Sequence, residues 1–126
     1  MPNFSEFEAK LPGRFNRLAL LQQAFTHRSY LNENQLTDEH NERLEFLGDA
    51  VLELVVTEFL FAKYPEENEG DLTAYRAALV NAETLARVAG KAGMNNYLLL
   101  SKGEARDTGR ARQTILANTF ESVVGA

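Results

Sequence analysis

Three acidic residues in the first half of the chain share one face of a predicted helix. Glu42, Glu45 and Asp49 are spaced i, i+3 and i+7. Because a helix advances about 100° per residue, their side chains fall within about 60° of one another. Aligned carboxylates repel one another, and partial burial adds a desolvation cost. A divalent cation would relieve both, and an all-oxygen ligand set favours Mg²⁺ or Mn²⁺.

A solvated acidic stripe is the alternative interpretation, and it is the commoner meaning of such a pattern. Glu53 continues the stripe and is consistent with simple surface. Gly48 favours a site, because a glycine inside a helix costs about 1 kcal/mol relative to alanine. It indicates close approach of another backbone or a ligand beside Asp49. Periodicity alone therefore predicts an acidic cluster, and leaves open whether it holds a metal.

The elements that would position these acids are helices. Helical periodicity recurs and strand signals are scarce, so an all-α domain is expected. The acidic helix is predicted over residues 39–63, ends before Pro65, and has apolar side chains on its other faces, so most of it is expected to be buried. Asn16 and Asn81 are predicted helix caps, and Gly93 a helix end. The remaining predicted helices cover residues 4–11, 16–27, 71–79, 82–91 and 114–126, with polar loops at 28–38 and 101–113.

Composition limits the class of protein. The chain has 126 residues, 44% of them hydrophobic and 25% charged, which suits one globular domain. With no cysteine it has neither disulfides nor thiolate metal sites. Neither a secretory signal nor a membrane-spanning run is visible, so a soluble, cytoplasmic protein is expected. The net charge of −5 argues against a nucleic-acid partner, although acids that hold cations would account for part of it.

One segment resembles a known family. Residues 42–50, Glu-Arg-Leu-Glu-Phe-Leu-Gly-Asp-Ala, resemble the nine-residue signature of ribonuclease III, and His40-Asn41 precede it as in that family. Further similar segments follow in family order along almost the whole chain, at residues 24–30, 69–72, 76–81, 101–104 and 115–121.

This resemblance implies a ribonuclease III endonuclease domain, an all-helical bundle that forms a homodimer and cuts both strands of double-stranded RNA. It implies metal-assisted hydrolysis with Mg²⁺, for which Mn²⁺ could substitute, leaving 5′-phosphate and 3′-hydroxyl ends. Processing of ribosomal and messenger RNA is the implied role. Residues 1–126 would form one domain whose last helix is truncated, without the double-stranded RNA-binding domain that usually follows in the family.

The resemblance also assigns roles residue by residue. The matched metal ligands are Glu45, Asp49, Asn118 and Glu121. The expected catalytic residues are Glu42, Asp49 and Glu121, and the residues implicated in RNA contact and the second metal are Glu42 and Glu69. Phe46 matches an aromatic knob that enters a socket on the partner subunit, although its residue type alone suggests ordinary core.

Residue 118 departs from the family pattern, which usually has aspartate there. Asparagine still offers a carbonyl oxygen, but as a neutral and weaker donor. A tolerated variant is the favoured interpretation. The alternative is a catalytically impaired module that binds RNA or scaffolds a ribonucleoprotein. A di-metal oxidase bundle is set aside, because it needs Glu-x-x-His pairs and the chain has none.

The remaining candidates are basic or aromatic. Arg106, Arg110 and Arg112 precede the last predicted helix, where they are either solvated charge or phosphate contacts. His27 and His40 lack the spacing of a histidine metal site and are predicted to have structural roles.

Overall fold

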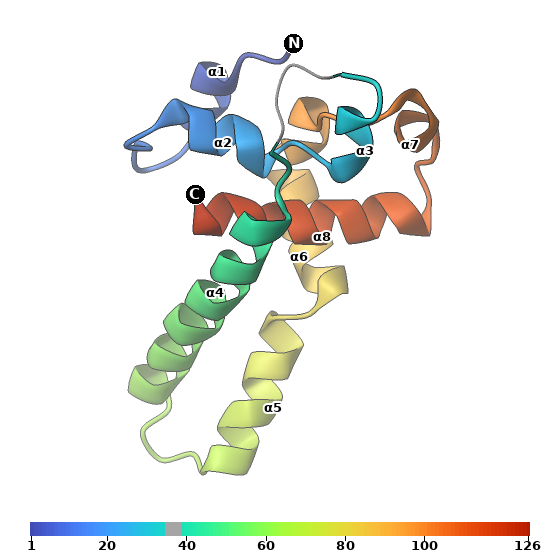
Figure 1. Ribbon diagram of the computed structural model, residues 1–126. Helices are drawn as coiled ribbons and strands as arrows, with labels where there is room; N and C mark the ends of the chain where they lie inside the picture. Colours follow the sequence, from blue (N-terminus) through green and yellow to red (C-terminus); the bar gives the residue numbers. More distant parts are fainter. Residues whose placement is uncertain (35–38) are drawn as a thin grey trace.

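The computed structural model describes residues 1–34 and 39–126, and all the regular elements named in these ranges are helices (Figure 1). Extended backbone pairs there at an isolated parallel bridge between Thr26 and Leu99. The predicted all-α class is confirmed. The helices are α1 (Phe4–Glu8), α2 (Leu18–Ala24), α3 (Arg28–Leu31), α4 (Glu42–Lys63), α5 (Glu69–Leu79), α6 (Ala82–Lys91), the 3₁₀ turn η1 (Met94–Tyr97), α7 (Lys102–Arg106) and α8 (Arg110–Gly125).

Helix α8 lies at the centre of the fold and packs against α4, α6 and α2. Figure 1 shows α4 leaving α8 and running away from the rest of the molecule, with α5 returning beside it to form a helical hairpin. The N-terminal half of α4, which bears the acidic residues, is therefore the half that meets α8. Nowhere in the described ranges is a helix long and apolar enough to cross a membrane.

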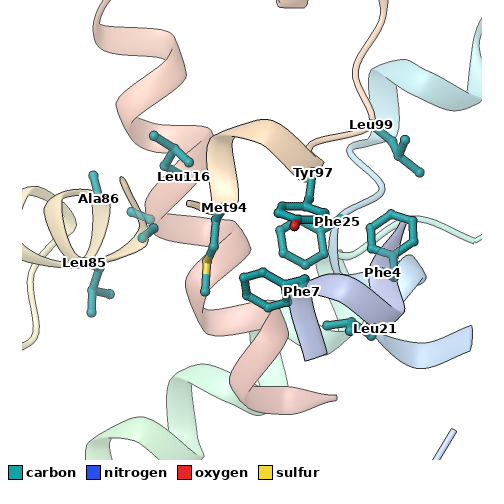
Figure 2. Close-up of a cluster of buried hydrophobic side chains, with 12 residues drawn as sticks. Phe4, Phe7, Leu21, Phe25, Leu85, Ala86, Met94, Tyr97, Leu99 and Leu116 are labelled. Atoms are coloured by element: carbon teal, nitrogen blue, oxygen red, sulfur yellow. The ribbon is translucent and has the colours of Figure 1, made fainter. Parts of the chain in front are cut away.

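An aromatic cluster fixes the N-terminal helices to this centre (Figure 2). The rings of Phe7 and Phe25 meet edge to face with their centroids 5.1 Å apart. Tyr97 of η1 lies 5.1 Å from Phe7 and 5.9 Å from Phe25. Such pairs add to the large apolar area that each ring buries. This packing positions the segment that follows α2, which reaches the candidate site.

Local capping explains two helix starts. Asn81 accepts a hydrogen bond from the Thr84 amide, so the predicted cap of α6 is confirmed. Gly93 follows this helix with a φ of 77°, a left-handed conformation that favours glycine, as predicted for its end. Helix α5 begins at Glu69, two residues before the predicted start, because Asn68 caps it by accepting from the Asp71 amide.

Several predicted boundaries are wrong. Arg17, not Asn16, precedes α2, and it makes no side-chain cap. Helix α2 ends at Ala24 instead of residue 27, because the Phe25 carbonyl accepts from the Leu99 amide and the His27 amide donates to the Leu99 carbonyl. The predicted loop at 28–38 begins with α3, and its residues 35–38 lie outside the described residues. The predicted loop at 101–113 contains α7 and the first turn of α8.

The expected burial of α4 is also wrong for a single chain. Only Gly48 and Leu60 of this helix are buried. Phe46 is 84% exposed, Leu54 66% and Phe61 73%. The reason is geometric: α8 and α5 pack against only part of this helix, and the rest of its apolar surface has no cover within the described residues of the chain. An exposed apolar surface of this kind marks an interaction site.

Candidate active site

Helices α4 and α8 cross with their backbones in contact. A Cβ atom on Gly48 would lie 1.6 Å from the Glu121 carbonyl oxygen, and one on Gly125 would lie 2.2 Å from the Leu44 carbonyl oxygen. Backbone atoms cannot yield by that much, so both positions require glycine. The close approach predicted at Gly48 is thus confirmed, and the approaching group is the backbone of α8. Gly125 was not predicted, because nothing in its local sequence identifies the helix it faces.

A buried polar network fixes the first turn of α4 next to α8. Asn41 is 4% exposed, and its side-chain amide donates to the Ala24 carbonyl at 2.9 Å. Its carbonyl accepts from the Ser122 hydroxyl at 3.1 Å and from the Glu45 amide at 2.9 Å. Ser122 and Glu121 are consecutive on α8. The network therefore sets the position of Glu121 against Glu45 and Asp49.

Two of the carboxylates predicted as metal ligands, Asp49 and Glu121, share a hydrogen bond where the helices cross, and the charge of the third, Glu45, acts on Glu121. Burial raises the pKa of Glu121 to about 8, and a hydrogen bond to Asp49 and the charges of Asp49, Glu45 and Glu53 add to the effect. Burial also raises the pKa of Glu45, with the charges of Glu42 and Asp49 contributing. Glu53 thus contributes to the field of the site, although its sequence position suggested only surface. Side chains from two helices form one electrostatic unit.

This donor set fits a hard divalent cation. Clustered, partly desolvated carboxylates are stabilised by either a proton or a metal ion, and oxygen ligands select Mg²⁺ or Mn²⁺. Among residues 1–34 and 39–126, no three histidine, cysteine, aspartate or glutamate side chains converge as a ready metal cage. The structure instead couples Glu121 to Asp49 by a hydrogen bond and to Glu45 by charge.

Asn118, the predicted fourth ligand, lies on the same side of α8 as this cluster. It lines a small pocket of about 50 Å³ between α3, α4 and α8. The other lining residues are His27, Arg28, Asn41, Glu42, Glu45 and Ile115. Asn118 and Glu45 therefore face a common space. The i, i+3 spacing of Asn118 and Glu121 places these two residues on one side of α8.

Glu42 lies at this pocket between two basic groups. Its carboxylate is 3.6 Å from the Arg28 guanidinium and 3.2 Å from the His40 imidazole. Both contacts are partly or largely exposed, so they orient the carboxylate more than they stabilise the fold. Sequence reasoning missed Arg28, whose neighbour Glu42 is distant in the chain.

His27 is the second residue of this pocket that sequence reasoning did not assign to the site. Its Nδ1 accepts a hydrogen bond from the Ser29 amide at 3.2 Å and lies 2.7 Å from the Ser29 hydroxyl. Burial lowers its pKa, an effect that the nearby charges of Glu104 and Glu42 oppose. The predicted structural role is confirmed, because His27 caps α3. Its position in the pocket also brings it next to the acidic residues of α4.

Glu69 lies far from the carboxylates of α4 and α8 in the structure of the single chain. It is at the start of α5, where it lines a different pocket with Thr57, Glu67 and Arg76. Asp49 and the end of α4 are separated by roughly 20 Å of helix, at 1.5 Å per residue. The predicted place of Glu69 at the catalytic centre therefore does not hold within a single chain.

The three arginines separate into two kinds. Arg106 ends α7 and Arg110 begins α8, and both are exposed, so a phosphate contact remains a prediction for them. Arg112 is 8% exposed, and the exposed position predicted for it is wrong. Its guanidinium donates to the Asn95 side chain at 2.7 Å and to the Glu104 and Ala105 carbonyls at 3.1 and 3.0 Å. Arg112 of α8 is therefore linked to α7 by buried hydrogen bonds.

Comparison with known proteins matches this chain to one family of enzymes. The family model described as Ribonuclease-III-like matches residues 18–126. Ribonuclease 3 of Streptococcus pyogenes is 51% identical over 114 residues, which are 90% of this chain and 50% of the relative. The chain thus spans about half the length of the curated relatives it matches.

Solved structures agree with the sequence comparison. The nuclease domain of ribonuclease III from Campylobacter jejuni superposes with a TM-score of 0.87 and 40% identity, over 98% of this chain and 82% of that one. Dicer from Pichia stipitis superposes with a TM-score of 0.68 and 32% identity, over 91% of this chain and 47% of that one.

Proposed function

Because the chain belongs to the ribonuclease III family, we propose that it is the catalytic domain of a metal-dependent endoribonuclease that cleaves double-stranded RNA. The observation that carries the proposal is the hydrogen bond of Glu121 on α8 to Asp49 on α4, within reach of the charge of Glu45. The cleavage products would carry 5′-phosphate and 3′-hydroxyl ends. Processing of ribosomal and messenger RNA would be its place in the cell.

The side chains at the site would have different roles. Glu45, Asp49, Asn118 and Glu121 would hold Mg²⁺ or Mn²⁺, which supplies charge neutralisation for the attacked phosphodiester and activation of a water. Glu42, oriented by Arg28 and His40, would accept hydrogen bonds from RNA or water at the pocket. The glycine contacts of α4 and α8 keep the two halves of the ligand set in register before any cation binds.

A homodimer is the assembly that the exposed surface of α4 supports. Phe46, Leu54 and Phe61 are each more than 60% exposed in the single chain, as their values of 84%, 66% and 73% show. In the nuclease domain of Campylobacter jejuni ribonuclease III, structural flexibility is described in a region involved in dimer formation. We propose that a second copy of the chain covers this apolar face, and that Phe46 of each copy inserts into a socket on the other.

The decisive test is cleavage of a long RNA duplex. The chain should cut it with Mg²⁺ or Mn²⁺ and not with EDTA, and Glu121→Gln should reduce the rate at least a hundredfold, because it removes one charged ligand. Glu83→Gln is the matched control, since Glu83 is an exposed acid on α6. It should cut at the parent rate.

Two results would contradict the proposal. If the chain leaves duplex RNA intact with both metals, it is not an active nuclease on its own. If Glu121→Gln cuts as fast as Glu83→Gln, the carboxylate cluster is not the catalytic centre.

A further inference from the structure

The hydrogen bonds around His27 fix its tautomer. The Ser29 backbone N–H can only donate, so Nδ1, at 3.2 Å, must be an acceptor without a proton. The Ser29 hydroxyl oxygen accepts from the Ser101 amide at 3.0 Å, which leaves its proton for Nδ1 at 2.7 Å. In the neutral ring the proton is therefore on Nε2. Burial, which lowers the pKa of His27, favours that neutral form.

Nε2 is an open donor at the site. In the part of the chain that the structure describes, it makes no hydrogen bond to protein, and it is absent from the buried polar atoms that lack a partner. Solvent therefore reaches it. The same residue lines the small pocket that also contains Glu42, Glu45 and Asn118. The parallel bridge of Thr26 with Leu99 holds the His27 backbone in place.

From this arrangement we propose that His27 is a specificity-determining residue that donates its Nε2–H to a ribose 2′-hydroxyl of the bound strand. The proposal rests on the function proposed above and names the group by which the site would distinguish RNA from DNA. Of the polar groups of a nucleic acid backbone, only the 2′-hydroxyl is specific to RNA.

The lining of the pocket favours a group that can both accept and donate hydrogen bonds. The pocket of about 50 Å³ has room for a few water-sized groups, since about 10–15 Å³ of such volume holds one water. It offers a donor, His27, next to a carboxylate that accepts, Glu42, which is not one of the proposed metal ligands. A hydroxyl both accepts and donates, so it can satisfy both sides. A phosphate oxygen only accepts, so it can satisfy His27 but not Glu42.

Two isosteric variants separate this role from the cap of α3. In His27→Asn, the side-chain oxygen takes the place of Nδ1 and can still accept from the Ser29 amide, but the Nε2 donor is lost. In His27→Gln, the side-chain amide nitrogen reaches the place of Nε2, but the cap is lost. If His27 contacts RNA, His27→Gln should bind the duplex more tightly than His27→Asn. If its role is only to cap α3, His27→Asn should bind more tightly.

The experiment measures duplex affinity by fluorescence anisotropy, with Ca²⁺ in place of Mg²⁺, for the parent chain and both variants. The probes are an all-ribose duplex and a series with one 2′-deoxy nucleotide moved along each strand. For the parent, deoxy substitution at one position should weaken binding roughly fivefold, the size of one net hydrogen bond. His27→Asn should lose the same factor on the all-ribose duplex and nothing further at that position. His27→Gln should behave as the parent.

If His27→Asn weakens every duplex equally and the deoxy penalty persists, or if Asn substitutes better than Gln, the assignment is wrong. Cleavage of the all-ribose duplex with Mg²⁺ is measured in parallel. If the duplex is not cleaved but His27→Asn still removes the deoxy penalty at one position, the proposed nuclease activity is wrong and the His27 contact stands. If the duplex is cleaved and His27→Asn leaves that penalty unchanged, the nuclease activity stands and the His27 contact is wrong.

Discussion

Glu121 carries a proton at neutral pH in the metal-free chain, because its pKa is raised to about 8 by burial and by Asp49. An unfolded glutamate ionises near pH 4.3. Between about pH 4.3 and this raised pKa, the folded state binds more protons than the unfolded state. Stability from this group therefore falls as pH rises through that window, and falls no further above it.

The first prediction follows from that sign. With EDTA present, Glu121→Gln should be more stable than the parent at about pH 9, by on the order of 1 kcal/mol after allowance for solvent screening, and nearly equal to it at about pH 4. Thermal unfolding at both pH values measures this. Mg²⁺ should raise the melting temperature of the parent and not of the variant. Equal curves at every pH would mean that Glu121 is not electrostatically strained.

Asn118 is the second residue whose role can be measured. Asn118→Asp adds one negative charge to a pocket that already contains Glu45. Mg²⁺ affinity should rise at least tenfold, because a further ligand charge near the ion is worth on the order of 1.4 kcal/mol or more. The metal-free variant should be less stable than the parent. Calorimetric titration gives the affinity, and an unchanged dissociation constant would show that residue 118 is not a ligand.

At the scale of the helices, the crossing of α4 and α8 decides the site. Helical periodicity placed Glu42, Glu45 and Asp49 on one face of α4, and Gly48 identified the face where another backbone arrives. Only the family resemblance indicated that α8 supplies the other acidic residue, Glu121, since no local rule relates residue 121 to residue 48. The loops at 28–38 and 101–113 were misjudged because their helices are short, and because a buried arginine of α8 holds α7 through contacts that periodicity does not reveal.

The glycine contacts provide the prediction at this scale. Gly125→Ala should lower the free energy of unfolding by about 1–3 kcal/mol, because its Cβ would lie 2.2 Å from a backbone oxygen of Leu44. It should also weaken Mg²⁺ binding where the variant is still folded, since the ligands move apart. Gly90→Ala is the control: a Cβ there meets nothing within 4 Å, so it should stabilise α6 by about 0.5–1 kcal/mol. Urea unfolding distinguishes them, and similar stabilisation by both would contradict the contact.

At the scale of the whole molecule, the proposed dimer would form through the exposed apolar face of α4. Phe46→Glu should convert a dimer into a monomer at micromolar concentration, because it places a charge where an 84% exposed ring would be covered. A loss of a hundredfold or more in dimer affinity is expected. Sedimentation velocity measures it, with Val88→Glu, a 41% exposed position on α6, as the control that should remain dimeric. A dimeric Phe46→Glu would remove the knob role.

The same scale explains why burial was misjudged. An apolar pattern on the other faces of α4, away from its acidic face, indicates that water is excluded from them, and the simplest interpretation is a core position. The structure of one chain leaves that surface open, since α5 and α8 cover only part of it. Pattern alone does not distinguish a core within the chain from an interface between two chains, because both bury the same side chains.

The amino-acid sequence determined the class of fold, the acidic face of α4, the caps at Asn81 and Gly93, and the need for a close neighbour at Gly48. These depend on contacts within a few residues, which propensity and periodicity describe. Only the tertiary structure decided that this neighbour is Glu121, that Gly125 reciprocates, that Glu69 lies far away and that His27 faces the pocket. Those facts depend on the path of the chain between distant residues, which is set by the packing of the whole core.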